Sequence, residues 1–194
     1  MVRSSMDGWV TPMVSNRQQG ARTIVAMKDH PNLAETEQAM RQYVESLGLD
    51  FEAAMAVSSI YRAANAVRSY ASNEVLRPYD LTWTGFVVLW VVWIFNGMET
   101  RHAAEAAAIS KATLTGVVKT LEGKGWIRKQ GREDDRRLVE IHLTAAGRRL
   151  MEEIYPRFNA MEATLVAGLP RPSQGEMTES LREIVKTIER IERP

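Results

Sequence analysis

The 194-residue sequence contains no cysteine. Disulfide bonds, thiolate metal sites and a cysteine redox sensor are therefore excluded within this chain, and the absence agrees with a reducing compartment. Histidine is also rare. His30, His102 and His142 have no second ligand at helix or strand spacing, so we expect neither a metal ion nor another cofactor.

Long apolar stretches are scarce as well. The run Phe86–Phe95 has ten residues, whereas a helix that crosses a membrane needs about twenty. The first thirty residues contain no basic segment followed by a long apolar one, so we expect no secretory signal. The sequence also lacks a nucleophile motif, a glycine-rich phosphate loop and a convergent carboxylate pair. These absences predict a cytoplasmic protein that is not an enzyme and has no membrane partner.

Net charge is low overall but is concentrated locally. The chain carries +1, yet the window from Ser110 to Arg149 holds ten basic residues against five acidic ones. This window therefore carries +5 and the remainder of the chain −4. A basic segment in an otherwise acidic chain is typical of a surface that binds phosphate groups. The alternative is a solvated charged face that binds nothing.

Helical periodicity dominates the chain beyond residue 31. Asn32 with Glu35 forms a capping box that begins one helix, and Asp50 begins a second that reaches about Leu76. The run Phe86–Phe95 is rich in β-branched and aromatic residues, so a strand is possible. We favour a fully buried central helix, because the neighbouring segments are helical. Thr144 begins a further long helix.

The apolar stripes of the outer helices are broad at both ends of the chain. In the last helix they comprise Leu181, Ile184, Val185, Ile188 and Ile191. A single copy of the chain would cover them poorly, which predicts a homodimer built from the terminal helices. The alternative is that these helices fold back onto their own domain.

The segment between Thr100 and Thr144 predicts a helix, a tight turn, a second helix and a hairpin. Ser110 is expected to cap the second helix, and segments 126–130 and 138–143 alternate as two paired strands around a charged tip. The fold class is therefore mainly α with a small β-hairpin. The inward face of the second helix consists of Leu114, Val117, Val118 and Leu121.

A helix that is apolar on one side and carries small polar side chains on the other suits the DNA major groove. The polar side here consists of Ser110, Lys111, Thr113, Thr115 and Lys119. Arginines of the hairpin tip can reach a neighbouring minor groove, and these are Arg132, Arg136 and Arg137. Asp135 is expected to pair with a nearby arginine and stiffen the tip. The alternative is a solvated turn whose acidic and basic side chains neutralise one another.

The residues Asp135, Arg137, Ile141 and Leu143–Thr144 resemble the wing signature D-x-R-x-x-x-V-x-L-T of the MarR (multiple antibiotic resistance regulator) family. The likeness covers about residues 51 to 192. Further matches are 110–113, Leu121–Glu122 and Gly125 in the recognition helix, and Leu81–Thr82, Phe86 and Leu89 in the preceding core helix.

This resemblance implies a winged helix-turn-helix dimer with an interface made by the terminal helices. Each recognition helix would enter the major groove of a pseudo-palindromic operator, and each wing would touch a minor groove. Arg136 then falls at the wing tip, while Asp135 and Arg137 become wing-stabilising residues. On this basis the chain divides into an N-terminal arm (1–31), N-terminal dimerisation helices (32–80), the DNA-binding region (81–144) and C-terminal dimerisation helices (145–194).

Three features depart from the family pattern. Gly116 stands where the family often has an arginine or another DNA-contacting side chain, and Gly85 occupies a site commonly filled by glutamine. The first fifty residues exceed the family plan, and the resemblance does not imply a role for them.

The resemblance also implies release from DNA by a small, often phenolic, anion. Candidate ligand-binding residues are Tyr61, Arg62, Trp83, Trp90 and Trp93, although an aromatic stripe can equally be plain core. The expected function is a sequence-specific transcriptional regulator, a repressor with a double-stranded DNA operator, a second copy of itself and a small aromatic effector as partners. The alternative function is a winged-helix module that docks on proteins without binding specific DNA.

Overall fold

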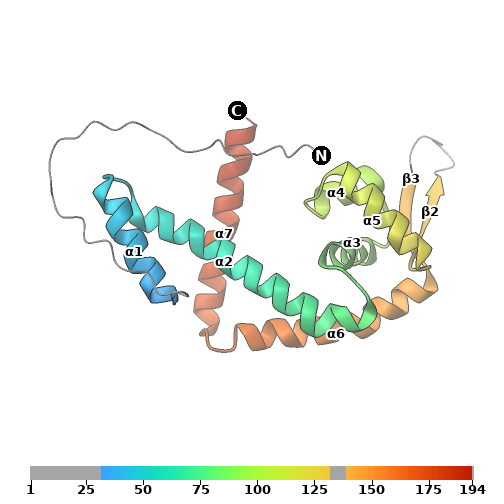
Figure 1. Cartoon of the computed structure of the whole chain (residues 1–194). Helices are drawn as coiled ribbons and strands as arrows, with labels where there is room; N and C mark the ends of the chain where they lie inside the picture. Colours follow the sequence, from blue (N-terminus) through green and yellow to red (C-terminus); the bar gives the residue numbers. More distant parts are fainter. Residues whose placement is uncertain (1–31, 132–138, 194) are drawn as a thin grey trace, which may run out of the picture. The chain divides into compact units, whose positions relative to one another are not determined.

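The computed structural model describes residues 32–131 and 139–193 (Figure 1). Its internal contacts divide the chain into two units, one up to Ser58 and one from Ser59 onward. Each unit is described by itself below.

The first unit contains α1 (Leu33–Ser46) and the beginning of α2 (Phe51–Ala71). The predicted capping box is present, since the side chains of Asn32 and Glu35 each accept a hydrogen bond from the other's backbone N–H. Asp50 Oδ1 likewise accepts from Ala53 N at 2.9 Å and begins α2 as predicted. The Arg41 guanidinium lies 4.0 Å from the centroid of the Phe51 ring and so covers it.

The second unit opens with the remainder of α2, which changes helix type before it ends. A π-helical segment η1 (Ser72–Leu76) is followed by a 3-10 turn η2 (Arg77–Tyr79). Ala71, Val75 and Leu76 are buried there and fix this segment against α3 and α6. The helical conformation therefore extends slightly beyond the predicted end near Leu76.

Helix α3 (Trp83–Ile94) forms the centre of the core. Thr82 Oγ1 accepts from Gly85 N at 3.1 Å and begins the helix. The apolar run is thus a helix, as favoured from the sequence. The expectation of complete burial is wrong along one side, because Trp90, Ile94 and Phe95 are exposed by 37%, 54% and 60%.

The next elements form a helix-turn-helix and a small sheet. They are β1 (Met98–Glu99), α4 (Thr100–Ala106), α5 (Lys111–Gly123), β2 (Ile127–Gly131) and β3 (Val139–Leu143). The three strands are antiparallel in the order β1-β3-β2, with Met98 opposite Ile141 and Ile127 opposite Leu143. The hairpin is confirmed. Strand β1 was not predicted, since two residues are too few to show an alternating pattern.

Helix α6 (Ala145–Leu165) begins at Thr144, whose Oγ1 accepts from Gly147 N at 3.0 Å. Its buried side chains pack against α3, where the Phe158 ring stacks on Phe86 with centroids 4.3 Å apart. Helix α3 therefore lies between α4 and α5 on one side and α6 on the other (Figure 1).

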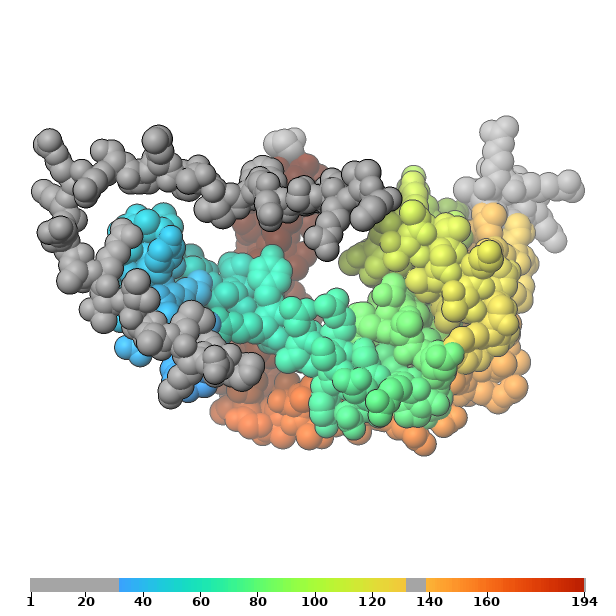
Figure 2. All heavy atoms as spheres, in the orientation of Figure 1, coloured from blue at the N-terminus to red at the C-terminus, as the bar shows by residue number. Residues whose placement is uncertain are grey.

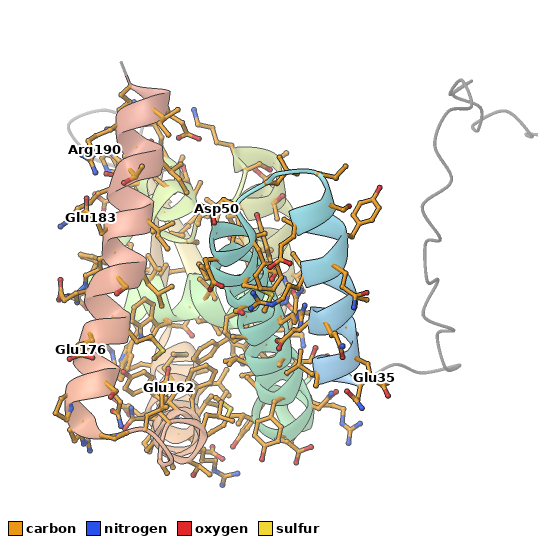
Figure 3. The ribbon with its side chains drawn as sticks, turned by 90° about the vertical axis from the view of Figure 1, so that its left-hand side faces the viewer. Glu35, Asp50, Glu162, Glu176, Glu183 and Arg190 are labelled. Atoms are coloured by element: carbon orange, nitrogen blue, oxygen red, sulfur yellow. The ribbon has the colours of Figure 1, made fainter. Side chains whose placement is uncertain are left out.

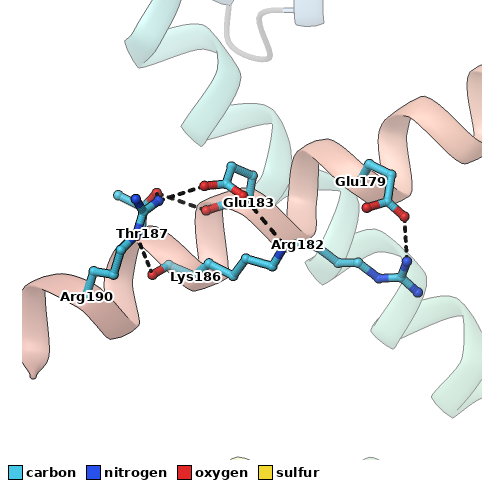
Figure 4. Close-up of polar contacts among 6 residues, drawn as sticks. All are labelled: Glu179, Arg182, Glu183, Lys186, Thr187 and Arg190. Carbon is cyan, nitrogen blue, oxygen red and sulfur yellow. Dashed lines mark hydrogen bonds and ion pairs between the residues drawn. The ribbon is translucent and has the colours of Figure 1, made fainter.

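Helix α7 (Arg171–Glu192) carries charged residues along one edge and apolar ones along another. Glu176, Glu183 and Arg190 lie on the charged edge (Figure 3), where Arg190 Nη2 is 2.6 Å from Glu183 Oε1 (Figure 4). Six apolar side chains are 39–71% exposed, and these are Met177, Leu181, Ile184, Val185, Ile188 and Ile191. In the described part of the chain, no helix combines the length and apolar character needed to cross a membrane.

Candidate nucleic-acid interface

The turn between α4 and α5 is held by small buried side chains. Ala103, Ala104 and Ala107 are at most 8% exposed, which allows the two helices to approach closely. Ile109 N donates to Ala104 O and Ala108 N to Glu105 O, the hydrogen-bond pattern of a helix that ends in a left-handed residue. Ala108 supplies that residue with a φ of 51°. The predicted turn at 108–109 is therefore confirmed.

The start of α5 is capped by Ser110, as predicted. Ser110 Oγ accepts from Thr113 N at 3.0 Å and lies 2.8 Å from Thr113 Oγ1. The first turn of a helix still leaves backbone N–H groups without intrahelical partners, and these attract anions. The exposed start of α5 is therefore suited to a phosphate oxygen.

Helix α5 buries one side and exposes the other (Figure 2, in yellow). Leu114, Val118 and Leu121 are at most 3% exposed and anchor it to the core, while Val117 is half-buried. At about 100° per residue the opposite side is formed by Ala112, Gly116, Lys119 and Gly123. A Cβ atom built on Gly116 or Gly123 would meet no heavy atom within 4 Å. Lys119 is therefore the one long side chain on this most exposed side of the helix.

The threonine hydroxyls of α5 are largely engaged within the helix. Thr115 Oγ1 donates to Lys111 O at 2.9 Å, and Thr120 Oγ1 donates to Gly116 O at 3.1 Å. A hydroxyl that donates to its own helix offers a partner only lone pairs and its methyl group. Thr115 is therefore placed as an acceptor or a methyl contact rather than as a donor.

Two lysines on the exposed side of α5 have no ionic partner among the residues that the structure describes. Lys111 and Lys119 form no ion pair within residues 32–131 and 139–193. Lys129, by contrast, pairs with Glu122 at 2.9 Å. Eight residues of helix separate the two free lysines by about 12 Å along the axis. Their ammonium groups give the exposed side of α5 a positive charge that no described carboxylate neutralises.

The base of the wing is held by the sheet. Ile127 and Ile141 are buried, and Gly97, with a φ of 115°, lets the His142 ring lie against the backbone. A Cβ on Gly97 would fall 2.2 Å from His142 Nδ1, so the site requires glycine. The tip residues predicted to contact DNA or stiffen the wing lie outside the described residues, and these are Arg132, Asp135, Arg136 and Arg137.

A polar contact that the sequence did not indicate joins the end of α5 to the connector before α3. Lys124 Nζ lies 2.5 Å from Asp80 Oδ2 and also donates to the Asp80 carbonyl oxygen. The Lys124 hydrogen bond, followed by its positive charge, lowers the pKa of Asp80. These two residues border a pocket of about 350 Å³ that Gly85 and Gly116 also line. Forty-four residues separate Lys124 from Asp80, so no local pattern could have paired them.

The candidate ligand-binding residues have different surroundings. Trp83 packs against Phe86 and Phe158, with ring centroids 6.4 and 6.1 Å apart. Trp93 meets the edge of Tyr155 at 5.3 Å. Trp90 is exposed by 37% and Tyr61 by 68%, while Arg62 is half-buried. Trp83 and Trp93 therefore contact different aromatic partners, and a ligand site formed by these five residues stays a prediction.

Comparisons with known proteins agree with this arrangement. The MarR family model matches residues 81–139, from the connector before α3 to the first residue of β3. The HTH-type transcriptional regulator YwaE of Bacillus subtilis (strain 168) is 38% identical over 161 residues, which cover 83% of this chain and 91% of YwaE.

Solved structures show the same fold. A mutant MarR from E. coli complexed with operator DNA superposes with a TM-score of 0.62 at 20% identity, covering 69% of this chain and 96% of that one. BpsR of Bordetella bronchiseptica, whose DNA binding is regulated by 6-hydroxynicotinic acid, gives a TM-score of 0.60 at 26% identity over 66% and 98% of the two chains. This chain therefore belongs to the MarR family of winged helix-turn-helix transcriptional regulators.

Proposed function

We propose that the protein is a repressor that binds a pseudo-palindromic operator as a homodimer, with α5 of each copy in the major groove. The observation that carries this proposal is the exposed side of α5, where Lys111 and Lys119 form no ion pair with the described residues and no bulky side chain stands between them. The major groove is about 12 Å wide and admits such a helix. The operator complex of the E. coli MarR mutant supports the same use of this fold.

The contacts follow from the chemistry of α5. The capped start of the helix and the two lysine ammonium groups meet phosphates, which positions the helix without reading sequence. Thr113 and Thr115 offer lone pairs to base amino groups and methyl groups to thymine. Arg132, Arg136 and Arg137 would extend the contact to the minor groove, with Asp135 and Arg137 stiffening the wing. The protein then acts where its operator is, in the cytoplasm, and works without catalysis.

The homodimer is supported by α7. Its six exposed apolar side chains lie on one side of the helix, opposite the charged edge of Glu179, Glu183 and Arg190. A helix with one apolar and one charged side is typical of one that packs against another element. A second copy of the chain supplies such an element for a protein that must contact two half-sites. Segments 32–80 and 145–194 would then form the dimer, and 81–144 the DNA-binding region.

Regulation by a small aromatic ligand is the remaining part of the proposal. The regulation of BpsR by 6-hydroxynicotinic acid supports a hydroxylated aromatic acid as effector. Tyr61, Arg62, Trp83, Trp90 and Trp93 stay the candidate contacts, with Arg62 meeting the carboxylate. If titration of such acids leaves the DNA affinity unchanged, the proposed ligand regulation is contradicted, while the proposed DNA binding is not.

The DNA contact is tested by removing one unpaired charge. Lys119→Met should weaken binding to a labelled operator duplex about three- to tenfold and lower the slope of log affinity against log salt by about one per copy. Arg68→Met removes the same charge from the exposed surface of α2 and should change neither quantity. Fluorescence anisotropy at several salt concentrations measures both.

The rival function, a winged-helix module that docks on proteins, predicts another outcome. An apolar protein contact depends little on salt, whereas release of counterions from DNA gives a steep dependence. Equal affinities and slopes for the wild-type protein, Lys119→Met and Arg68→Met would overturn the placement of α5 in the groove.

A further inference from the structure

The contact between Lys124 and Asp80 lies where three parts of the fold meet. Asp80 directly follows η2, Lys124 directly follows α5, and Trp126 precedes β2. The Lys124 ammonium lies 2.5 Å from Asp80 Oδ2 and 4.9 Å from the centroid of the Trp126 ring. One side chain thus touches the end of the α2 segment, the recognition helix and the base of the wing.

The connector itself is fixed in place. Asp80 has a left-handed backbone with a φ of 49°, and its N–H donates to Arg77 O, which closes the 3-10 turn. The preceding residue, Tyr79, donates its hydroxyl to Glu153 Oε1 on α6 at 2.8 Å. Lys124 therefore binds a turn that is already attached to the α3–α6 core.

The apolar contacts of α5 hold one side of the helix against the core. Leu114, Val118 and Leu121 pack against the core, and apolar contacts are non-directional. A charged hydrogen bond is directional and short. The Lys124 side chain is only 26% exposed, so its ammonium is held close to the protein rather than extended into solvent.

We propose that the Lys124–Asp80 contact positions the recognition helix, so that DNA affinity depends on two residues that do not touch DNA. The proposal rests on the proposed insertion of α5 into the major groove. The contact sets the position of α5 along its axis and its rotation about that axis. These two quantities determine where Lys111, Thr115 and Lys119 meet the groove. Lys124 and Asp80 are positioning residues in this account.

The alternative is that Lys124 contacts a DNA phosphate directly. The two possibilities predict opposite effects for Asp80→Asn, which keeps the size of the side chain and tolerates the left-handed backbone. If Lys124 positions α5, Asp80→Asn weakens DNA binding, though less than Lys124→Met does, because the backbone carbonyl of residue 80 still accepts from Lys124. If Lys124 contacts a phosphate, Asp80→Asn frees the ammonium and removes a negative charge, so binding becomes stronger.

The experiment measures the affinity of both single variants and the double variant for a duplex that the wild-type protein selects from random DNA. The change in each copy should lower the DNA affinity about two- to fivefold, the range of an exposed ion pair. Because a dimer carries two copies, the two factors multiply. The double variant should lose no more affinity than Lys124→Met alone, and the slope of log affinity against log salt should stay unchanged. Stronger binding by Asp80→Asn, or a lower slope for Lys124→Met, would overturn the proposal.

Glu183→Gln and Arg190→Met are matched controls. They break an exposed ion pair of 2.6 Å on the charged edge of α7 (Figure 4), and should leave DNA affinity unchanged.

Hydrogen exchange of the α5 amides gives a reading that needs no DNA. Asp80→Asn and Lys124→Met should both speed exchange in residues 111–124, and unchanged exchange in both would also overturn the proposal. A wild-type protein that binds no DNA would instead overturn the proposed function.

Discussion

Ala108 holds the turn of the helix-turn-helix in a conformation that alanine adopts at a cost. Its φ of 51° is left-handed, and a Cβ atom in that region costs roughly 1–2 kcal/mol. Glycine is the usual residue at this place after a helix. The residue is exposed, so no packing against its methyl group compensates.

Ala108→Gly should therefore stabilise the protein. The relief of the left-handed strain exceeds the greater chain entropy of unfolded glycine, which leaves a net gain of about 0.5–1 kcal/mol in the free energy of unfolding. Denaturant unfolding measures it. Ala106→Gly, in the last turn of α4, should give no gain. Lower stability of Ala108→Gly than of the wild-type protein would show that the turn is not strained.

At the scale of the helix, the bare outer line of α5 distinguishes this chain from the family pattern. Gly116 lies in the middle of an exposed helical face, where glycine costs about 1 kcal/mol relative to alanine. The resemblance to the family implies an arginine or another DNA-contacting side chain at this place. Lys111 and Lys119 are left as the side-chain cations of the exposed side of α5 before its last turn.

Gly116→Arg should strengthen DNA binding. Arginine adds one phosphate or base contact at the outermost line of α5, so affinity should rise about three- to tenfold and the salt slope should steepen by about one per copy. Gly116→Gln is the control, since it improves helix propensity as much but adds no charge. Equal DNA affinity and equal slope for the two variants would contradict the orientation assigned to α5.

Helix starts were the most predictable elements because their signal is local. Asn32, Asp50, Thr82, Ser110 and Thr144 each accept a backbone hydrogen bond where the sequence indicated a helix start. Helix α7 lacks such a residue. The helix begins at Arg171 behind Pro170, with no side-chain cap.

The features that the sequence did not predict depend on distant partners. The Lys124–Asp80 contact and the pairing of β1 with β3 join segments more than forty residues apart. The exposed side of α3 could not be predicted either, because Trp90, Ile94 and Phe95 are as apolar as the buried residues beside them. The recognition helix was predictable, since its cap and its apolar face both lie within fourteen residues.

At the scale of the whole molecule, the exposed apolar side of α7 should decide the oligomeric state. Ile188→Lys places a charge in the middle of this stripe, where Ile188 is 49% exposed. Burial of an unpaired charge in an interface is costly, so the variant should become monomeric at micromolar concentration and lose operator binding. Sedimentation equilibrium measures the mass.

The control for this variant is on the opposite edge of the same helix. Glu179→Lys also introduces a lysine, and it breaks only an exposed ion pair with Arg182. It should stay dimeric. If Ile188→Lys and Glu179→Lys have the same mass as the wild-type protein, then α7 does not form the interface.

Selection of bound sequences from random DNA tests whether a dimer of this protein reads DNA through α5. Two copies of α5 related by a two-fold axis predict an inverted repeat whose half-site centres are about 10–10.5 base pairs apart, or a multiple of this spacing. Recovery of such a repeat supports a dimer that reads DNA through α5. Recovery of sequences with no common motif would contradict it.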